Sequence, residues 1–327
     1  MKAAARQGSA DQPKEARMRV SALITTYNHA AYIDAALDSL LAQTHADIEI
    51  IVADDGSTDG TFERAGRFEA RGVTVWRADG EGPSQAMNAN MLRATGDVFV
   101  LQSGDDVSLP HRVTRQLELL ARADVTFAAP QVIDRSGSPV PDDEMPSFVR
   151  KVEPGSEALF RSLFLEGNFI CASSVALRRS AWERVGGFNA GLLQLQDYDW
   201  WMRALCAELR FAADDDQVAQ YRWHGANLSD FSNATRIYRE LAFILREVAE
   251  KAPEPLLSAV HFGSAAKAQV MPRSVLAALC CLQHESELVR QVGADLMIRI
   301  MNRADCDTMI GPLGLSRRAM FEALRAK

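Results

Sequence analysis

Short apolar segments alternate with segments of helical periodicity from Val20 onward, and this alternation restricts the fold more than any other feature of the sequence. Strands joined by helical crossovers form a mostly parallel sheet with helices on both faces. The sequence therefore predicts an α/β, Rossmann-like fold with a mostly parallel mixed sheet flanked by helices. The predicted strands are Val20–Thr25, Ile48–Ala53, Val73–Trp76, Val98–Gln102 and Phe169–Leu177, and the predicted helices are Tyr32–Gln43, Thr58–Arg71, Ser84–Ala94, Ser180–Val185 and Asp197–Leu205.

The pattern divides the chain into three parts. Residues 1–17 are polar and are expected to form a disordered tail. Residues 18–230 carry the strand–helix alternation and are predicted to form the catalytic domain. Residues 231–327 show helical stretches without a convincing strand, broken at Pro253, Pro255 and Pro272. We expect a helical C-terminal region whose apolar faces pack on the α/β domain, form a homodimer or face a membrane.

Charge and cysteine usage exclude several classes of protein. The formal charge of -7 argues against a nucleic-acid-binding protein, which usually carries a basic face. The five cysteines follow no zinc-binding spacing and form no CxxC pair, which indicates reduced thiols and a cytoplasmic location. Since no apolar run reaches about 18 residues, we expect no transmembrane helix.

A first acidic cluster follows the second predicted strand. Asp54 and Asp55 precede the run Gly56-Ser57-Thr58-Asp59-Gly60. Ligands of parallel sheets bind at the carboxyl ends of the strands, and a carboxylate there can accept hydrogen bonds from a base or a ribose. The alternative is a capped strand-to-helix turn, in which Asp55 or Ser57 accepts hydrogen bonds from backbone N–H groups.

A second acidic cluster, Ser103-Gly104-Asp105-Asp106, ends the strand predicted at Val98–Gln102. Mg²⁺ and Mn²⁺ take one or two carboxylates together with phosphate oxygens and water. Such an ion would offset the charge of a nucleotide diphosphate and act as a Lewis acid on a departing diphosphate. The alternative is an acidic turn that leads into the next helix.

Two further clusters lie closer to residue 230. Gln196 and Asp197 begin a predicted helix, where Asp197 either caps the helix or serves as a general base that removes a proton from an attacking hydroxyl. His224 is flanked by cationic and aromatic residues such as Trp223. It either binds a metal or a phosphate, or it is structural.

In this order, the clusters resemble those of the family-two glycosyltransferases, which have the GT-A fold. Ser21–Asn28 is similar to the opening strand of that family, and Asp54–Thr61 matches its Asp-Asp-Gly-Ser-Thr-Asp-Gly-Thr run without a change. Gly96–Pro110 resembles its metal-binding strand, and the region from Arg179 to Arg203 resembles its acceptor side. The resemblance extends from Val20 to Ser229, so residues 18–230 are expected to form a GT-A domain.

The resemblance implies an inverting glycosyltransferase that uses a nucleotide-diphospho-sugar (UDP, GDP or dTDP) and a divalent cation, Mn²⁺ or Mg²⁺. The implied roles are nucleotide binding for Thr25, Tyr27, Asp55 and Asn88, metal binding for Asp105 and His224, and general base catalysis for Asp197. The remaining expected residues of the site are Asp54, Ser103, Asp106, Gln196, Trp201 and Trp223. The two tryptophans either stack on sugar rings or pack in the core.

Three positions depart from the family's pattern. Ser103 stands where the Asp-x-Asp metal motif has its first aspartate, and a hydroxyl or a water would fill that place. Gln196 replaces the usual glutamate before Asp197, which removes a charge and keeps a hydrogen-bonding side chain. Met87 replaces an arginine near the diphosphate. The residues that the chemistry needs remain.

The predicted acceptor is a saccharide or a lipid-linked saccharide in polysaccharide or glycoconjugate assembly, and a lipid-linked acceptor would place the protein peripherally at the inner face of the membrane. Two other classes stay open. A nucleotidyltransferase usually has a Gly-rich loop with a basic residue after the first strand, whereas this chain has Thr-Tyr-Asn-His there. A non-catalytic GT-A protein that binds nucleotide-sugars is the other alternative, because of Ser103 and Gln196.

Overall fold

The computed structural model describes residues 18–141, 155–225, 227–228, 234–264, 271–311, 314 and 316–325, and the predicted tail 1–17 lies outside them. The main sheet contains β1 (Val20–Thr26), β2 (Ile48–Asp54), β3 (Val73–Arg77), β4 (Val98–Ser103), β6 (Val125–Ala128), β8 (Ala176–Arg178) and β9 (Phe211–Asp214). A second sheet contains β5 (Val107–Ser108), β7 (Gln131–Ile133) and β10 (Ala219–Arg222).

The main sheet is mixed and mostly parallel, in the order β3-β2-β1-β4-β8-β6-β9. Strands β3, β2, β1 and β4 run parallel, and β8 runs antiparallel to both β4 and β6. Six of the seven residues of β1 are buried, because this central strand has helices on both of its faces. The predicted α/β architecture, with a mostly parallel mixed sheet flanked by helices, is confirmed.

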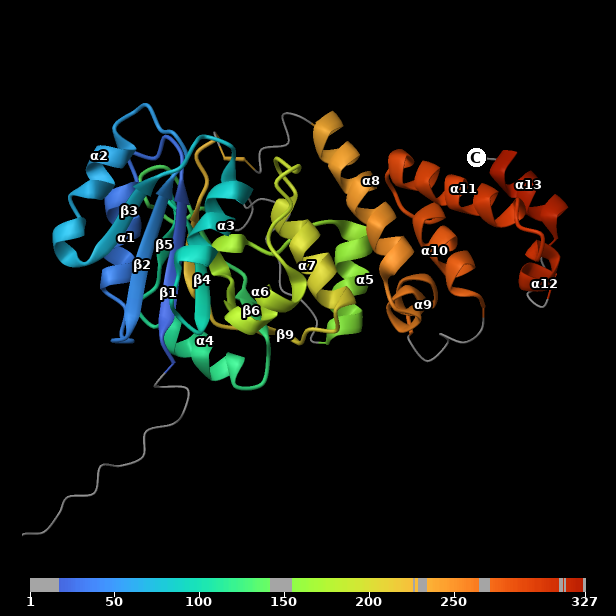
Figure 1. Cartoon of the computed structure of the whole chain (residues 1–327), viewed down its shortest axis with the longest axis horizontal. Coiled ribbons are helices and arrows are strands. Elements are labelled where there is room, and N and C mark those ends of the chain that lie inside the picture. The colour runs from blue at the N-terminus through green and yellow to red at the C-terminus, as the bar shows by residue number, and fades with distance from the viewer. Residues whose placement is uncertain are drawn as a thin grey trace, which may run out of the picture.

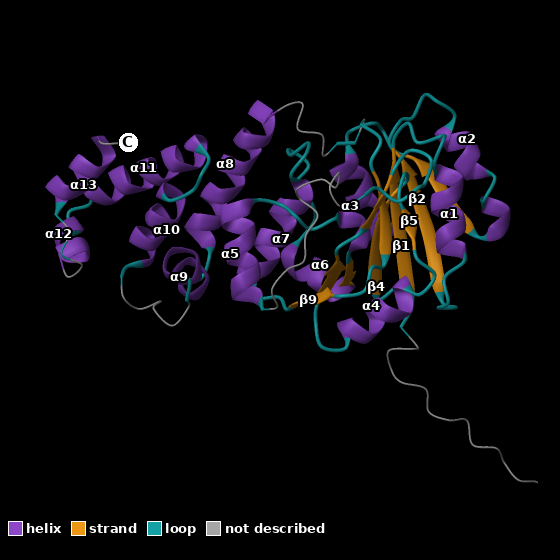
Figure 2. Ribbon diagram, turned by 180° about the vertical axis from the view of Figure 1, so that it is seen from behind, coloured by secondary structure: helices purple, strands orange, loops and turns teal. Residues whose placement is uncertain are grey.

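Helices flank this sheet and form the C-terminal part of the chain (Figures 1 and 2). Those of the α/β part are α1 (Ile33–Leu41), α2 (Thr61–Gly66), α3 (Pro83–Arg93), α4 (Arg112–Leu120), α5 (Ser156–Glu166), α6 (Arg179–Val185) and α7 (Gln196–Cys206). Those that follow are α8 (Ala234–Lys251), α9 (Glu254–Phe262), α10 (Arg273–Leu282), α11 (Glu287–Met301), α12 (Cys306–Ile310) and α13 (Arg317–Arg325).

The C-terminal helices extend away from the main sheet, with α12 and α13 farthest from the strands (Figure 1). One hydrophobic cluster nevertheless includes Phe99 of β4, Trp201 of α7, Ile244 of α8 and Val289 of α11. Burial of apolar surface is the main stabilising contribution to such contacts. The helical region therefore packs on the α/β part, as the first of the three alternatives predicted. No helix in the described ranges is long and apolar enough to cross a membrane.

The strand predicted at Phe169–Leu177 is largely wrong. A short 3-10 helix occupies Ala172–Ser174, and the strand β8 starts only at Ala176. Two serine side chains explain the difference, because they replace ladder hydrogen bonds. The Ser173 hydroxyl accepts a hydrogen bond from the backbone N–H of Ser103 (2.9 Å), and the Ser174 hydroxyl donates to the Cys171 carbonyl (2.8 Å).

Candidate functional site

The carboxyl ends of three neighbouring strands bring the predicted clusters to one edge of the main sheet. In the register of the sheet, Thr26 of β1 pairs with Asp54 of β2, and Thr25 pairs with Ser103 of β4. Gly104 continues this alignment, because its backbone N–H donates to the carbonyl of Thr25 (3.0 Å). The first and second acidic clusters therefore flank the end of β1, where ligands of parallel sheets bind.

Asp54 and Asp55 have different surroundings in the turn after β2. Oδ2 of Asp54, which is fully buried, accepts a hydrogen bond from the Ser57 N–H (3.1 Å) and lies 3.4 Å from Nε of Arg77. Oδ1 of Asp55 is buried and has no hydrogen-bond partner in the described part of the chain. Burial raises the pKa of Asp55. Oδ1 of Asp54 is likewise buried without a partner there, so each of the two carboxylates has an oxygen available to a ligand, while Oδ2 of Asp54 also stabilises the turn.

The end of β1 is fixed to this turn through Asn28. Asn28 has a φ of 56°, in the left-handed region that asparagine tolerates better than most residues. Its N–H donates to the Ser57 hydroxyl (2.8 Å), and its Oδ1 accepts from the Thr58 N–H (2.9 Å). These bonds direct the chain toward β4, so that His29 comes to lie beside Asp105.

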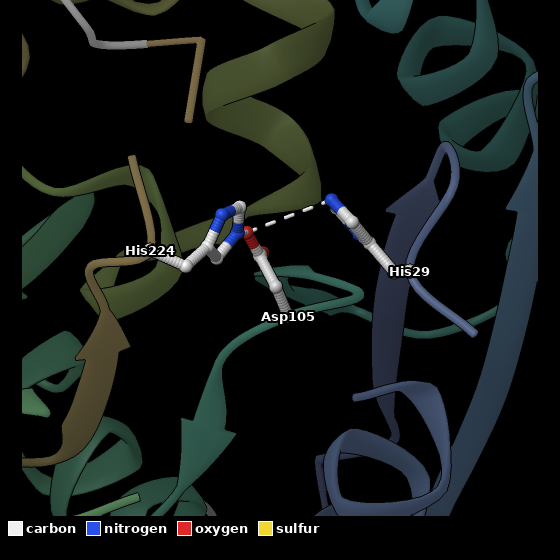
Figure 3. Close-up of side chains that lie close together, drawn as sticks. All are labelled: His29, Asp105 and His224. Atoms are coloured by element: carbon white, nitrogen blue, oxygen red, sulfur yellow. Dashed lines mark hydrogen bonds and ion pairs between the residues drawn. The ribbon is translucent and has the colours of Figure 1, made fainter. Parts of the chain in front are cut away.

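His29, Asp105 and His224 form the candidate metal centre (Figure 3). Nε2 of His224 lies 3.0 Å from Oδ2 of Asp105, and Nε2 of His29 lies 3.6 Å from the same oxygen. The ligand atoms of the three residues all lie within 4.8 Å of one another. Oδ1 of Asp105 is buried without a partner among the described residues. This nitrogen and oxygen donor set suits a divalent transition-metal ion.

The electrostatics keep Asp105 ionised. Burial favours the neutral acid, but the hydrogen bond with His224 and the interaction with His29 outweigh it, so the pKa of Asp105 is lowered. Burial and the charge of Asp105 raise the pKa of Asp106 well above its usual value. Oδ1 of Asp106 accepts a hydrogen bond from the Arg222 N–H (2.8 Å). Asp106 therefore joins β4 to β10, whereas Asp105 presents a carboxylate to the cluster.

Contacts of the ring and hydrogen bonds of the backbone hold His224 in place. The ring of Tyr32 stacks on the His224 ring, with 5.1 Å between the centroids. The Arg222 guanidinium lies over the Tyr32 ring, 4.9 Å from its centroid. The carbonyl of His224 accepts a hydrogen bond from Nε of Arg135 (2.8 Å), and its N–H donates to Oδ1 of Asn227 (2.9 Å). The strand β10 thus delivers an oriented imidazole to the centre.

Asp197, the predicted base, lies in the first turn of α7. Burial raises the pKa of Asp197 to about 6. Two hydrogen bonds to its carboxylate oppose that rise: the Tyr198 N–H donates to Oδ1 (2.7 Å), and Nδ2 of Asn168 donates to Oδ2 (3.1 Å). A pKa near neutrality is what a general base needs. Asn168, which the sequence did not single out, orients this carboxylate.

A carboxylate of α8 holds the segment that precedes α7. The side chain of Glu240 accepts hydrogen bonds from three successive backbone N–H groups, those of Leu193 (3.0 Å), Gln194 (3.0 Å) and Leu195 (2.9 Å). These groups lie directly before the first residue of α7, where a negative charge also interacts favourably with the helix dipole. The C-terminal region therefore fixes the start of the helix that carries Asp197.

Trp201 and Trp223, which were predicted either to stack on sugar rings or to pack in the core, have different surroundings. Trp201 is fully buried and packs edge-on against Trp200 at 5.4 Å, which corresponds to the alternative of packing in the core. Trp223 is 43% exposed, next to His224, and has a face available to a ligand.

The remaining predicted residues lie in different surroundings. Tyr27 is 55% exposed at the end of β1. Asn88 uses its whole amide on the backbone of Phe188, accepting from the N–H and donating to the carbonyl (both 2.8 Å), and so joins α3 to the turn after α6. Oε1 of Gln196 is buried and finds no partner in the described ranges. Ser103 is the last residue of β4, and its side chain contributes to the lowered pKa of Asp105.

The prediction from the sequence missed His29, because this residue lies in the loop after β1 and not at the end of a strand. The available signal was its position immediately after Thr26-Tyr27-Asn28, which places it at the same edge of the sheet as Asp105.

Comparison with known sequences finds glycosyltransferases. A family model described as glycosyl transferase family 2 matches residues 21–186. An uncharacterized glycosyltransferase of Nostoc sp. is 30% identical over 224 residues, which cover 64% of this chain and 66% of the relative. One from Rickettsia felis is 30% identical over 63% of this chain and 34% of its own length. The O-antigen biosynthesis glycosyltransferase WbnJ of Escherichia coli is 25% identical over 71% of this chain and 89% of its own.

Solved structures share the fold. TarS 1-349 of S. aureus, in complex with UDP-GlcNAc, superimposes with a TM-score of 0.60 at 16% identity, covering 95% of this chain and 93% of the other. The mannosyltransferase PcManGT of Pyrobaculum calidifontis, in complex with GDP-Man and Mn²⁺, gives 0.53 at 16% identity, covering 94% and 84%. The chain spans only 34% to 66% of the first curated relatives that it matches. Because the family model spans half of its residues, the chain belongs to glycosyltransferase family 2.

Proposed function

We propose that this chain transfers a sugar from a nucleotide-diphosphate donor to an acceptor hydroxyl, with inversion at the anomeric carbon. The observation that carries the proposal is the contact between Asp105 and His224, which are 119 positions apart in the chain, at the sheet edge where Asp55 also lies. A relative named for O-antigen biosynthesis supports a role in polysaccharide or glycoconjugate assembly. The donors bound in TarS and PcManGT, UDP-GlcNAc and GDP-Man, support a nucleotide-sugar here.

The nucleotide would bind beside the ends of β1 and β2. The free oxygen of Asp55 would accept hydrogen bonds from the base or the ribose, together with Thr25 and the exposed ring of Tyr27. Met87 offers the diphosphate no charge, so the compensation of its negative charge falls on the centre around Asp105. Asn88, which is fully used by Phe188, would shape this region through α3 and would not contact the donor through its amide.

A divalent cation, Mn²⁺ or Mg²⁺, fits the centre, because the unpartnered buried oxygen of Asp105 and the imidazole of His224 are ligands of the right type. When bound, it would neutralise the diphosphate and stabilise it as a leaving group. The chain's own contribution there is orientation: Tyr32 holds the His224 ring, and Arg222 fixes the backbone of Asp105 through its carbonyl (2.9 Å).

Asp197 would act as the base. It accepts the proton of the acceptor hydroxyl while that oxygen forms a bond to the anomeric carbon, and the bond from this carbon to the diphosphate oxygen breaks on the opposite face. The desolvation of the half-buried Asp197 would supply the raised pKa, and Asn168 and the Tyr198 N–H would supply its orientation. Positioning and charge compensation account for most of the acceleration in such a displacement. Trp223 would contact the acceptor saccharide.

The test is a panel of UDP-, GDP- and dTDP-sugars, incubated with Mn²⁺ or Mg²⁺ and with saccharide or lipid-linked acceptors. We expect release of the nucleoside diphosphate from one donor and a product whose anomeric configuration, read by NMR coupling constants, is opposite to that of the donor. Asp197→Asn should abolish transfer and leave donor binding intact. A product with retained configuration would refute the inverting mechanism. Donor binding without transfer to any acceptor would support a non-catalytic protein that binds nucleotide-sugars.

A further inference from the structure

We propose that His29 is a direct ligand of the cation, so that two imidazoles and one carboxylate hold the metal and make the centre select Mn²⁺ over Mg²⁺. This inference rests on the cation site of the proposed function and assigns it a ligand from the first strand–helix connection. It explains how the centre can bind a cation although Ser103 contributes a hydroxyl and no carboxylate.

The geometry around Asp105 supports coordination better than it supports an ion pair. Nε2 of His29 and Nε2 of His224 both approach Oδ2 of Asp105, at 3.6 and 3.0 Å, while Oδ1 is buried without a partner among the described residues. A buried carboxylate oxygen without a hydrogen-bond partner destabilises the fold unless a ligand such as a cation contacts it. At 3.6 Å, His29 is also too far for a hydrogen bond. A cation between the three side chains would use all of these atoms.

The chain fixes His29 through its backbone. Its carbonyl accepts hydrogen bonds from the N–H groups of Tyr32 and Ile33 (both 2.9 Å) at the start of α1. The next residue, Ala30, donates its N–H to Oδ2 of Asp59 (3.0 Å). Together with the left-handed Asn28 before it, these bonds leave the side chain of His29 pointing toward Asp105 (Figure 3). A preformed orientation of this kind lowers the entropy cost of binding.

Gly104 allows the two loops to approach this closely. A Cβ atom at Gly104 would lie 2.4 Å from Oγ1 of Thr26 and 3.0 Å from Nδ1 of His29. The absence of a side chain is thus required where the end of β4 passes the connection that carries His29. The close approach brings the histidine and Asp105 into one coordination sphere.

The ligand set has a consequence for the choice of metal. Mg²⁺ requires oxygen ligands and retains its waters, whereas Mn²⁺ and later divalent metals accept imidazole nitrogen. Two neutral histidines and one carboxylate contribute a single negative charge, so a bound dication keeps a net positive charge for the diphosphate oxygens. We expect Mn²⁺ to bind more tightly than Mg²⁺ by roughly tenfold or more.

The experiment measures binding of Mn²⁺ alone to the full-length protein, from the loss of the EPR signal of free Mn²⁺, with Mg²⁺ as competitor. Four proteins are compared: the parent, His29→Ala, the double variant with His29→Ala and Ser103→Asp, and His45→Ala. His45 is a matched control, because it is a half-buried histidine whose Nε2 pairs with the carbonyl of Met18, away from the centre. Thermal unfolding checks each fold, and His29→Gln replaces the alanine variant if that one is not folded.

We expect His29→Ala to weaken Mn²⁺ binding roughly tenfold or more, and His45→Ala to leave it unchanged. The double variant should regain affinity with a preference shifted toward Mg²⁺, because a carboxylate oxygen then replaces the imidazole. Equal Mn²⁺ affinities of His29→Ala and His45→Ala would overturn the proposal, as would a parent protein that leaves all Mn²⁺ free. If the parent binds Mn²⁺ through His29 and cleaves no nucleotide-sugar, the ligand assignment stands and the proposed function fails.

Discussion

Replacing Asn168 with alanine should move the acidic limb of the pH–activity profile upward by about one pH unit. Burial raises the pKa of Asp197 to about 6, and the hydrogen bond from Asn168 (3.1 Å) opposes that rise by stabilising the carboxylate. A hydrogen bond to a charged group contributes about 1.5–3 kcal/mol, and one pH unit corresponds to about 1.4 kcal/mol. Because the Tyr198 N–H still donates to the carboxylate of Asp197, we expect the loss of Asn168 to raise the pKa of Asp197 by about one unit.

The sign follows from the role of Asp197 as a base. Only the carboxylate accepts the acceptor's proton, so activity is lost as the pH falls through the pKa, and a higher pKa moves this loss to higher pH. In the unmodified protein kcat/KM should halve near pH 6. In Asn168→Ala it should halve near pH 7 and recover most of its value by pH 9, because the ionised base is then restored.

The assay is release of nucleoside diphosphate from the donor that the panel identifies, measured as kcat/KM between pH 5 and pH 9. Asn189→Ala is the matched control. Its side chain accepts a hydrogen bond from the Gly191 N–H (3.0 Å) in the turn before α7, and no hydrogen bond between described residues joins it to Asp197. An acidic limb of Asn168→Ala at the same pH as that of Asn189→Ala, or at a lower one, would refute the reasoning.

Three further predictions concern stability. Asp197→Asn should raise the free energy of unfolding at pH 8 by at most about 3 kcal/mol and have little effect at pH 4. The reason is that the ionised Asp197 destabilises the folded protein, and Asp197 is ionised only above its raised pKa of about 6. Equal effects at both pH values in urea unfolding would contradict this. Gly104→Ala should destabilise by about 1–3 kcal/mol, because the added Cβ would lie 2.4 Å from Oγ1 of Thr26, and an unchanged unfolding midpoint would refute the close approach. Trp201→Ala should cost about 3–5 kcal/mol as a core deletion, whereas the exposed Trp223→Ala should leave the melting temperature unchanged; similar melting temperatures would argue against these surroundings.

The strands that sequence reasoning located well are the buried ones of the parallel part. Val20–Thr25 and Ile48–Ala53 each differ from the observed β1 and β2 by a single residue, because a strand covered on both faces is a continuous apolar run. The strands that it missed, such as β5 (two residues) and β7 (three residues), are too short to show any periodicity. Their pairing with β10 depends on contacts distant in the chain.

The candidate site was predictable where a side chain follows a strand and hidden where a loop supplies it. Asp55 and Asp105 were found because each ends an apolar run. His29 depends on the left-handed conformation of Asn28 and on the missing side chain at Gly104, and neither has a signature in a single sequence. Asn168, which reaches Asp197, directly precedes the segment predicted as a strand, Phe169–Leu177.

The three hydrogen bonds that Glu240 accepts make the position of α7 depend on the position of α8. They join α8 to the start of α7, although the two helices lie on opposite sides of residue 230, where the strand–helix alternation of the sequence ends. A partner or a surface that tilts α8 would therefore change the orientation of Asp197 without touching the base. It also follows that a chimera that exchanges the C-terminal region with that of a relative must keep a carboxylate at position 240 to keep an oriented base.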